Sequence, residues 1–315
     1  MNTYRALSLS LVIVAAFSVV VTIAAERRAP APKFSSDSFR GVFFTKSSEA
    51  IRGSRPGMGA AQAAGQAPAV NARIPGTAAS PAANASGFSG LISPATLEDE
   101  IKRLRLELDT GVTTPAAFQS GGFKDARVQL SILASLFAIV TEHNGDVRWK
   151  KDAPAARDLI ARTALNCKSG SGQVYNEVKQ RKGDLEDLVS GTGLAAREAE
   201  LTNDWSVIAD RVPLMIYLQK TLDGPLKEGT QNAAAVKAEA ERVRRAAELV
   251  ASVSEILTKP GLADAEDTDY AAFSKELTAA ARGISLALDQ GDPAAVSSAV
   301  GAVTQACDKC HEAYR

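Results

Sequence analysis

The chain has 315 residues, which is enough for one or two domains. Hydrophobic residues make up 45% and aromatic residues only 5%, and this balance, with abundant alanine, favours helices over strands. Basic and acidic residues are equal at 36 each, so no net charge draws the chain to nucleic acid, and three cysteines cannot build a disulfide framework.

The N-terminus contains an uncharged apolar run from residue 6 to residue 25, with charged residues on both sides. Crossing a bilayer takes about 17–25 such residues, whereas the apolar core of a signal peptide has about 7–15. Residues 1–28 are therefore predicted to be either a membrane anchor or a cleaved signal peptide. Both alternatives export the rest of the chain.

Two regions follow before the last third of the chain. Residues 29–95 are rich in Ala, Pro, Gly and Ser and show no periodicity, which predicts a disordered linker. Apolar residues at helical spacing then begin with Leu97, Ile101 and Leu104, and a nearly continuous apolar stretch covers residues 124–143. Two further helical stretches follow it, so residues 96–200 are predicted to be a helical region.

Residues 201–315 contain four amphipathic segments joined by short loops. The first is predicted over residues 205–222 and the second over residues 230–258. The third starts after Asp267, a good N-cap, and ends at Gly291. The fourth starts with Asp292 as its N-cap and Pro293 in its first turn. The fold class is therefore all-α, with an antiparallel four-helix bundle at the C-terminus.

The last helix carries the sequence CDKCH. Cys307 and Cys310 continue its apolar stripe, and His311 lies on an adjoining edge of the same face. This geometry suits covalent attachment of c-type haem, in which two thiols add to the porphyrin vinyl groups and the histidine becomes the proximal iron ligand. A redox dithiol, or a zinc site completed by Cys167, is the alternative, although Cys167 otherwise fits a buried small apolar residue.

The ending GDPAAVSSAVGAVTQACDKCHEAYR resembles the last helix of class II c-type cytochromes, the group of cytochrome c-prime and its low-spin relatives. The segment TDYAAFSKELTAAARGISLAL is similar to the third helix of that family, with Tyr270 and Phe273 near its start. The likeness covers residues 203–315 and implies one covalently bound haem c. Because WKKDAPAARDLIARTAL faintly echoes the third helix, residues 96–200 are alternatively a degenerate bundle without haem.

The sixth position of the iron decides what such a haem does. Met215 is one candidate, because it follows Arg211 near the start of the first bundle helix, which is similar to the low-spin members of the family. The alternative role for Met215 is an ordinary core residue. His143 is a weaker candidate and is equally compatible with a solvated cap at a helix end. If neither residue binds, the site is open to small gases.

The predicted function is a mono-haem electron carrier, not an enzyme, since the sequence has no phosphate-binding loop, nucleophile elbow or histidine–carboxylate cluster. It is expected in the periplasm, tethered to the inner membrane or secreted. The alternatives are a five-coordinate haem protein that binds NO or CO, and a helical scaffold with a zinc-binding or vestigial motif. The expected partners are an unidentified redox protein, a second copy of the chain, and the membrane if the N-terminus is uncleaved; nucleic acid is not expected.

Overall fold

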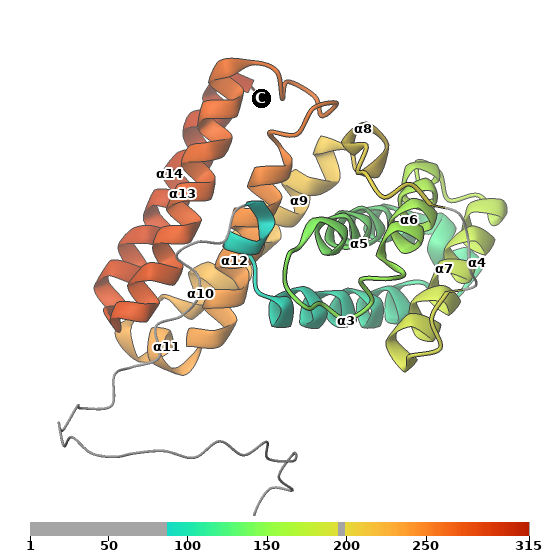
Figure 1. Cartoon of the computed structure of the whole chain (residues 1–315), viewed down its shortest axis with the longest axis horizontal. Coiled ribbons are helices and arrows are strands. Elements are labelled where there is room, and N and C mark those ends of the chain that lie inside the picture. The colour runs from blue at the N-terminus through green and yellow to red at the C-terminus, as the bar shows by residue number, and fades with distance from the viewer. Residues whose placement is uncertain (1–86, 195–198, 315) are drawn as a thin grey trace, which may run out of the picture. The chain divides into compact units, whose positions relative to one another are not determined.

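The structure is a computed structural model that describes residues 87–194 and 199–314. The predicted anchor or signal peptide, residues 1–28, and most of the predicted linker lie outside these ranges. The described ranges are helical and contain no strand (Figure 1), as predicted. Within them, no helix combines the length and the hydropathy that spanning a bilayer would require.

The helical elements follow one another along the chain with short connections. In the first half they are η3 (Gly87–Gly90), α3 (Pro94–Gly111), α4 (Pro115–Ala117), η4 (Phe118–Gly122), α5 (Phe123–Glu142), α6 (Ala153–Asn166) and α7 (Gly172–Ser190). In the second half they are α8 (Trp205–Ile208), α9 (Arg211–Thr221), η5 (Leu222–Leu226), α10 (Lys227–Gly229), α11 (Ala233–Ala238), α12 (Ala240–Ile256), α13 (Thr268–Gln290) and α14 (Pro293–Tyr314).

The first group of long helices is α3, α5, α6 and α7. Helix α5 is its centre, because nearly all of its apolar side chains are buried between α3 and α6. Helix α7 closes the group by packing on both α6 and α3. The structured part begins earlier than predicted: Phe88 and Ile92 are buried in the core, although both fall within the predicted linker, residues 29–95.

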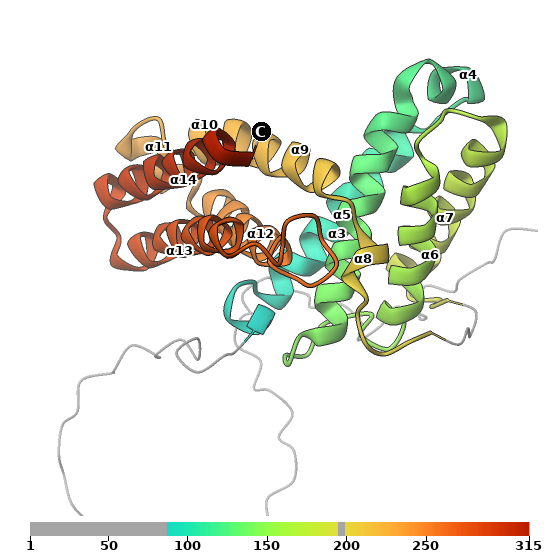
Figure 2. The same cartoon turned by 90° about the horizontal axis from the view of Figure 1, so that it is seen from above.

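The second group is a four-helix bundle made of α9, α12, α13 and α14. Helices α12, α13 and α14 pack in sequence order, and α13 and α14 run side by side in both views (Figures 1 and 2). The predicted caps are present: Asp267 accepts hydrogen bonds from the first backbone N–H groups of α13, and Gly291 ends that helix with a positive φ. The prediction of an all-α bundle is confirmed.

The first bundle helix is not continuous, contrary to prediction. Helix α8 stops at Ile208, and α9 begins only at Arg211. Pro213 explains the break, because a proline ring collides with the carbonyl four residues earlier, here that of Ala209. Restarting at Arg211 places Pro213 in a first turn, where its missing N–H does no harm. The break also changes the phase of the apolar stripe and leaves Val212 exposed.

The second bundle helix also differs from the prediction of one segment over residues 230–258. It starts at Ala233, where the Asn232 side chain accepts a hydrogen bond from the Ala235 N–H, and it is interrupted at Glu239. Between α9 and this helix, the π-turn η5 contains Pro225, which has no N–H to continue the helical ladder. Helix α9 is therefore a short helix with irregular backbone at both ends.

The two groups of helices pack on each other along α9. The Tyr217 hydroxyl donates to Glu100 Oε1 at 2.7 Å, in a buried contact between α9 and α3. Helix α5 packs against α9, and Arg127 on α5 pairs with Asp210 at the start of α9. Both groups belong to one compact unit, residues 75–315. One face of α9 is thus fixed on the first group of helices.

Candidate haem site

The apolar stripe of α14 places the motif residues as the sequence predicts. The Asp292 carboxylate accepts hydrogen bonds from the N–H groups of Ala294 and Ala295 and so fixes the start of the helix. Val296, Val300 and Val303 are buried, and Cys307 and Cys310 continue this line as half-buried side chains. The final turns of α14 therefore present two thiols towards the bundle.

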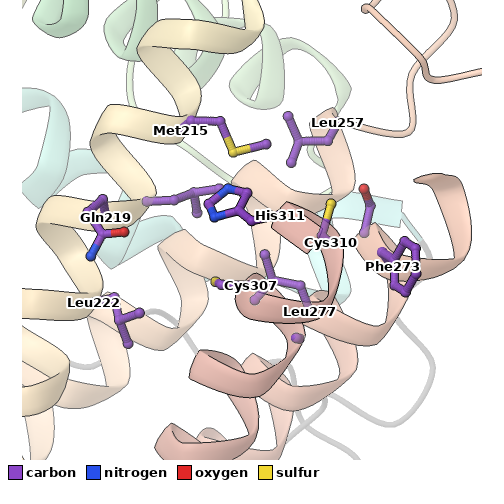
Figure 3. A pocket seen from close by; sticks show the side chains of 12 residues that line it. Met215, Gln219, Leu222, Leu257, Phe273, Leu277, Cys307, Cys310 and His311 are labelled. Atoms are coloured by element: carbon purple, nitrogen blue, oxygen red, sulfur yellow. The ribbon is translucent and has the colours of Figure 1, made fainter. Parts of the chain in front are cut away.

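An apolar cleft lies between α9 and the ends of α12, α13 and α14 (Figure 3). The side chains of Met215 and His311 project into it from opposite walls, and the two cysteines lie on either side of the histidine. Helix α9 does not pack closely on α14, so the seam between them forms the cleft. The lining residues are Met215, Leu218, Gln219, Leu222, Leu257, Phe273, Ser274, Leu277, Ala306, Cys307, Cys310 and His311.

The cleft suits a flat apolar group in chemistry but is narrow. Its cavity volume is only about 30 Å³, and four leucine side chains line it. A macrocycle therefore fits only if these side chains turn aside and α9 moves away from α14. The donor set, two thiols, an imidazole and a thioether in an apolar slot, is that of a c-type haem site.

The cysteines are held in their protonated form. Burial raises the pKa of Cys307 to about 11, with a further contribution from Asp308. Burial also raises the pKa of Cys310, although the nearby Arg211 guanidinium acts in the opposite direction. Neutral thiols rather than thiolates are therefore expected here at neutral pH. This argues against the alternative of a reactive redox dithiol, which needs a lowered pKa.

Aromatic and charged groups lie close to Cys310. The rings of Tyr270 and Tyr314 meet edge to face at 5.2 Å between centroids, and the Tyr314 hydroxyl donates to Asp267 Oδ1 at 2.7 Å. The Arg211 guanidinium lies 5.8 Å above the centre of the Tyr270 ring and pairs with Asp264. The Tyr270 hydroxyl is buried, and the nearby Arg211 guanidinium opposes the rise that burial causes in the pKa of this phenol. A cationic and a hydroxyl donor thus lie beside the motif.

The other predicted candidates lie away from the cleft. His143 is buried rather than a solvated cap: Nε2 contacts the Ile92 carbonyl at 3.0 Å and Nδ1 accepts from the Gly145 N–H at 2.9 Å. Both ring nitrogens are used, so His143 does not bind iron. Cys167 is buried at the end of α6, as predicted. No group of three or more potential metal ligands occurs in the described ranges, so the structure does not bring Cys167 together with the motif residues.

Gln219 and Tyr270 were not predicted as site residues. Gln219 lies one turn after Met215 on α9, so its i+4 spacing could have indicated that it shares the cleft. The Tyr270 hydroxyl gave no signal in the sequence, because its ring belongs to the apolar stripe of α13 and its contact with Arg211 joins two helices far apart in the chain.

Comparison with known proteins finds a family match in the C-terminal part of the chain. Residues 214–315 match the family model described as Cytochrome C'. The match starts later than the likeness at residue 203 predicted from the sequence, and it contains Met215 and the complete motif. No curated protein and no solved structure matches the chain. Residues 214–315 therefore form a region of the cytochrome c′ family, and its cofactor is a single covalently attached haem c.

Proposed function

We propose that this haem-binding protein is an electron carrier that takes up and releases single electrons on the exported side of a bacterial membrane. Cys307 and Cys310 would hold the porphyrin through thioether bonds, His311 would bind the iron on one side, and Met215 would bind it on the other. A bound haem supplies a one-electron couple between ferric and ferrous iron.

One observation carries this proposal. Met215 comes from α9 and His311 from α14, yet both project into one narrow cleft (Figure 3). The match to Cytochrome C' covers the residues of the motif and is compatible with His311 as the proximal ligand. It is the thioether on the opposite wall that favours a six-coordinate carrier over an open iron site.

The surrounding residues suit electron transfer. Leu218, Leu222 and Leu277 form apolar walls that exclude water, so few dipoles would reorient when the charge on the iron changes. The Arg211 guanidinium, which lies near Cys310, would offset the negative charge of a haem carboxylate. The mouth itself brings one edge of the site close to the surface, where a redox partner could approach.

The test of the sixth ligand is the spin state of the ferric holoprotein, made in a host that matures c-type cytochromes. We expect a low-spin electron paramagnetic resonance spectrum and a methionine-to-iron charge-transfer band. Met215→Leu keeps the size of the side chain but removes the sulfur, so this variant should become high-spin. Leu218→Ala, on the same wall of the cleft, is the matched control and should stay low-spin.

The same experiment separates the alternative function. A high-spin wild-type spectrum, unchanged in Met215→Leu, would rule out methionine ligation and favour the five-coordinate protein that binds NO or CO. The apolar walls would admit such uncharged gases. Export and membrane tethering are a separate part of the proposal. They rest on the apolar run at residues 6–25, and the intact mass of the mature protein tests whether that run is cleaved.

A further inference from the structure

A second and wider cleft lies on the other side of α9. It holds about 700 Å³, within the usual range of about 300–1,000 Å³ for small-molecule sites. On α9, the residues that line this second cleft are Tyr217, Lys220 and Thr221. No residue lines both this cleft and the haem cleft. The other walls come from α3, α5, η5 and α12.

The inner wall of this cleft is apolar. Leu104, Val128 and Leu249 are buried along it, from three different helices, and Ala246 leaves space beside them. Leu106 stands at the rim with 57% of its surface exposed. Such a surface favours the apolar body of a ligand, since burying it removes apolar area from water.

The rim is predominantly cationic, with five basic and three acidic side chains among the lining residues. One acid, Glu100, is already saturated by the Tyr217 hydroxyl and by two N–H groups of Arg103, at 2.6 and 2.8 Å. Arg242 pairs with Glu228, and Arg245 pairs with Asp99, which also lines the cleft; both pairs are exposed. Exposed pairs contribute little to stability, so both arginines can turn to a ligand anion at low cost.

We propose that this cleft binds a small organic anion with an apolar ring body. The anionic group would lie between Arg242 and Arg245, and the rings would lie on Leu104 and Leu249. The site is independent of the haem, because the two clefts share no residue.

The test uses the full-length holoprotein and the probe 8-anilinonaphthalene-1-sulfonate, which combines an anionic group with apolar rings. Isothermal titration calorimetry should give one site. The double variant Arg242→Ala/Arg245→Ala should weaken binding by about tenfold or more, since two charge-assisted hydrogen bonds are lost. Ala246→Trp, which fills the cleft without a change of charge, should abolish binding.

The matched control is Arg244→Ala. Arg244 is on the same helix but pairs with Asp289 on α13 and does not line the cleft, so affinity should stay within about twofold. Wild-type affinity in both the double arginine variant and Ala246→Trp would overturn the proposal and would place the probe elsewhere, for example in the haem cleft. So would an equal loss in Arg244→Ala. The two arginines are exposed, so the double variant should fold even if Ala246→Trp does not.

Discussion

At the scale of single residues, the three cysteines should differ in the reactivity of their thiols. Burial raises the pKa of Cys167 to about 12, so the thiol is both covered and protonated at neutral pH. Cys307 and Cys310 have no free thiol once haem is attached. We expect the native holoprotein to show no thiol reactive with Ellman's reagent at pH 8, and the protein in guanidinium chloride to show one.

Two controls make this thiol count decisive. Cys167→Ala should give no reactive thiol in either state. The apoprotein, made in a host that does not attach haem, should give three in denaturant, because the chain has three cysteines. Three thiols in the denatured holoprotein would mean that no thioether bond forms and would remove the basis of the proposed site.

A second prediction for a single residue concerns the hydroxyl of Tyr217. Tyr217→Phe removes a donor from the buried Glu100 carboxylate, and the free energy of unfolding should fall by about 1–2 kcal/mol. Tyr175→Phe is the control, since its hydroxyl bonds to the Thr113 carbonyl at an exposed site, and it should cost less than about 0.5 kcal/mol. Urea unfolding followed by circular dichroism measures both, and equal losses would contradict a special role for the buried pair.

The buried phenol of Tyr217 also predicts how the stability of the fold depends on pH. Burial, and then the Glu100 carboxylate, raise the pKa of Tyr217 well above its usual value. In the unfolded chain this phenol loses its proton near pH 10, whereas the folded protein keeps it bound. Stability from this group is therefore complete below about pH 10 and is lost as the pH rises beyond it. Tyr217→Phe should show a smaller loss of stability between pH 9 and pH 11 than the wild type.

At the scale of elements, α9 depends on its neighbours for its position. It is an 11-residue helix with irregular backbone at both ends, too short to be stable alone. Its contacts with the first group of helices, Arg127–Asp210 and Tyr217–Glu100, hold the face opposite Met215. If Met215 binds the iron, Arg127→Gln/Tyr217→Phe should loosen that bond and raise the high-spin fraction to on the order of a tenth.

Electron paramagnetic resonance of the ferric holoprotein measures this fraction. Arg244→Ala, which removes a surface pair on α12, is the control and should leave the spectrum unchanged. An unchanged spectrum in the double variant would mean that α9 keeps its position through apolar packing alone.

The N-cap of α13 predicts a change of stability in acid. The Asp267 carboxylate accepts hydrogen bonds from the Tyr314 hydroxyl and from the N–H groups of Tyr270 and Asp269, and these contacts lower its pKa. Its stabilisation is present above the unfolded value of about 3.9 and is lost as the pH falls through the lower folded value. Asp267→Ala should therefore lower the melting temperature at pH 7 but much less at pH 2, while Asp269→Asn, an exposed neighbour, should change little at either pH.

Most helices could be predicted, because each has its own apolar period and its own cap. Pro213 could also have predicted the break before α9, since this proline excludes a helix that passes through Ala209. The apolar spacing of the segment instead suggested one continuous helix. The burial of His143 could not be predicted from the sequence, because its partners are a distant carbonyl of Ile92 and a local turn.

The motif at Cys307, Cys310 and His311 could be placed in a haem site because short-range spacing sets its geometry. The contact of Tyr217 with Glu100 joins residues far apart in the sequence, and no local pattern indicates it.

At the scale of the whole molecule, the structure predicts that both groups of helices unfold together. The interface contains the buried Tyr217–Glu100 hydrogen bond and the contact of Ser93 with Glu248 at 2.9 Å, and α5 packs directly on α9. Leu133 is fully buried in α5, within the first group of helices. Leu133→Ala should destabilise the protein by about 2–5 kcal/mol. If the groups are coupled, the haem should report this loss although it lies in the other group.

The measurement is urea unfolding of the holoprotein, followed through the Soret band for the haem region and through Trp149 fluorescence for the first group. A Trp205→Phe background isolates Trp149, because the chain has only two tryptophans. In Leu133→Ala both transitions should move together to lower urea, since one cooperative unit has one midpoint. A fluorescence midpoint that falls while the Soret midpoint stays in place would show two independent domains. The residues before α8 would then be a separate module and could not hold α9, and with it Met215, in position.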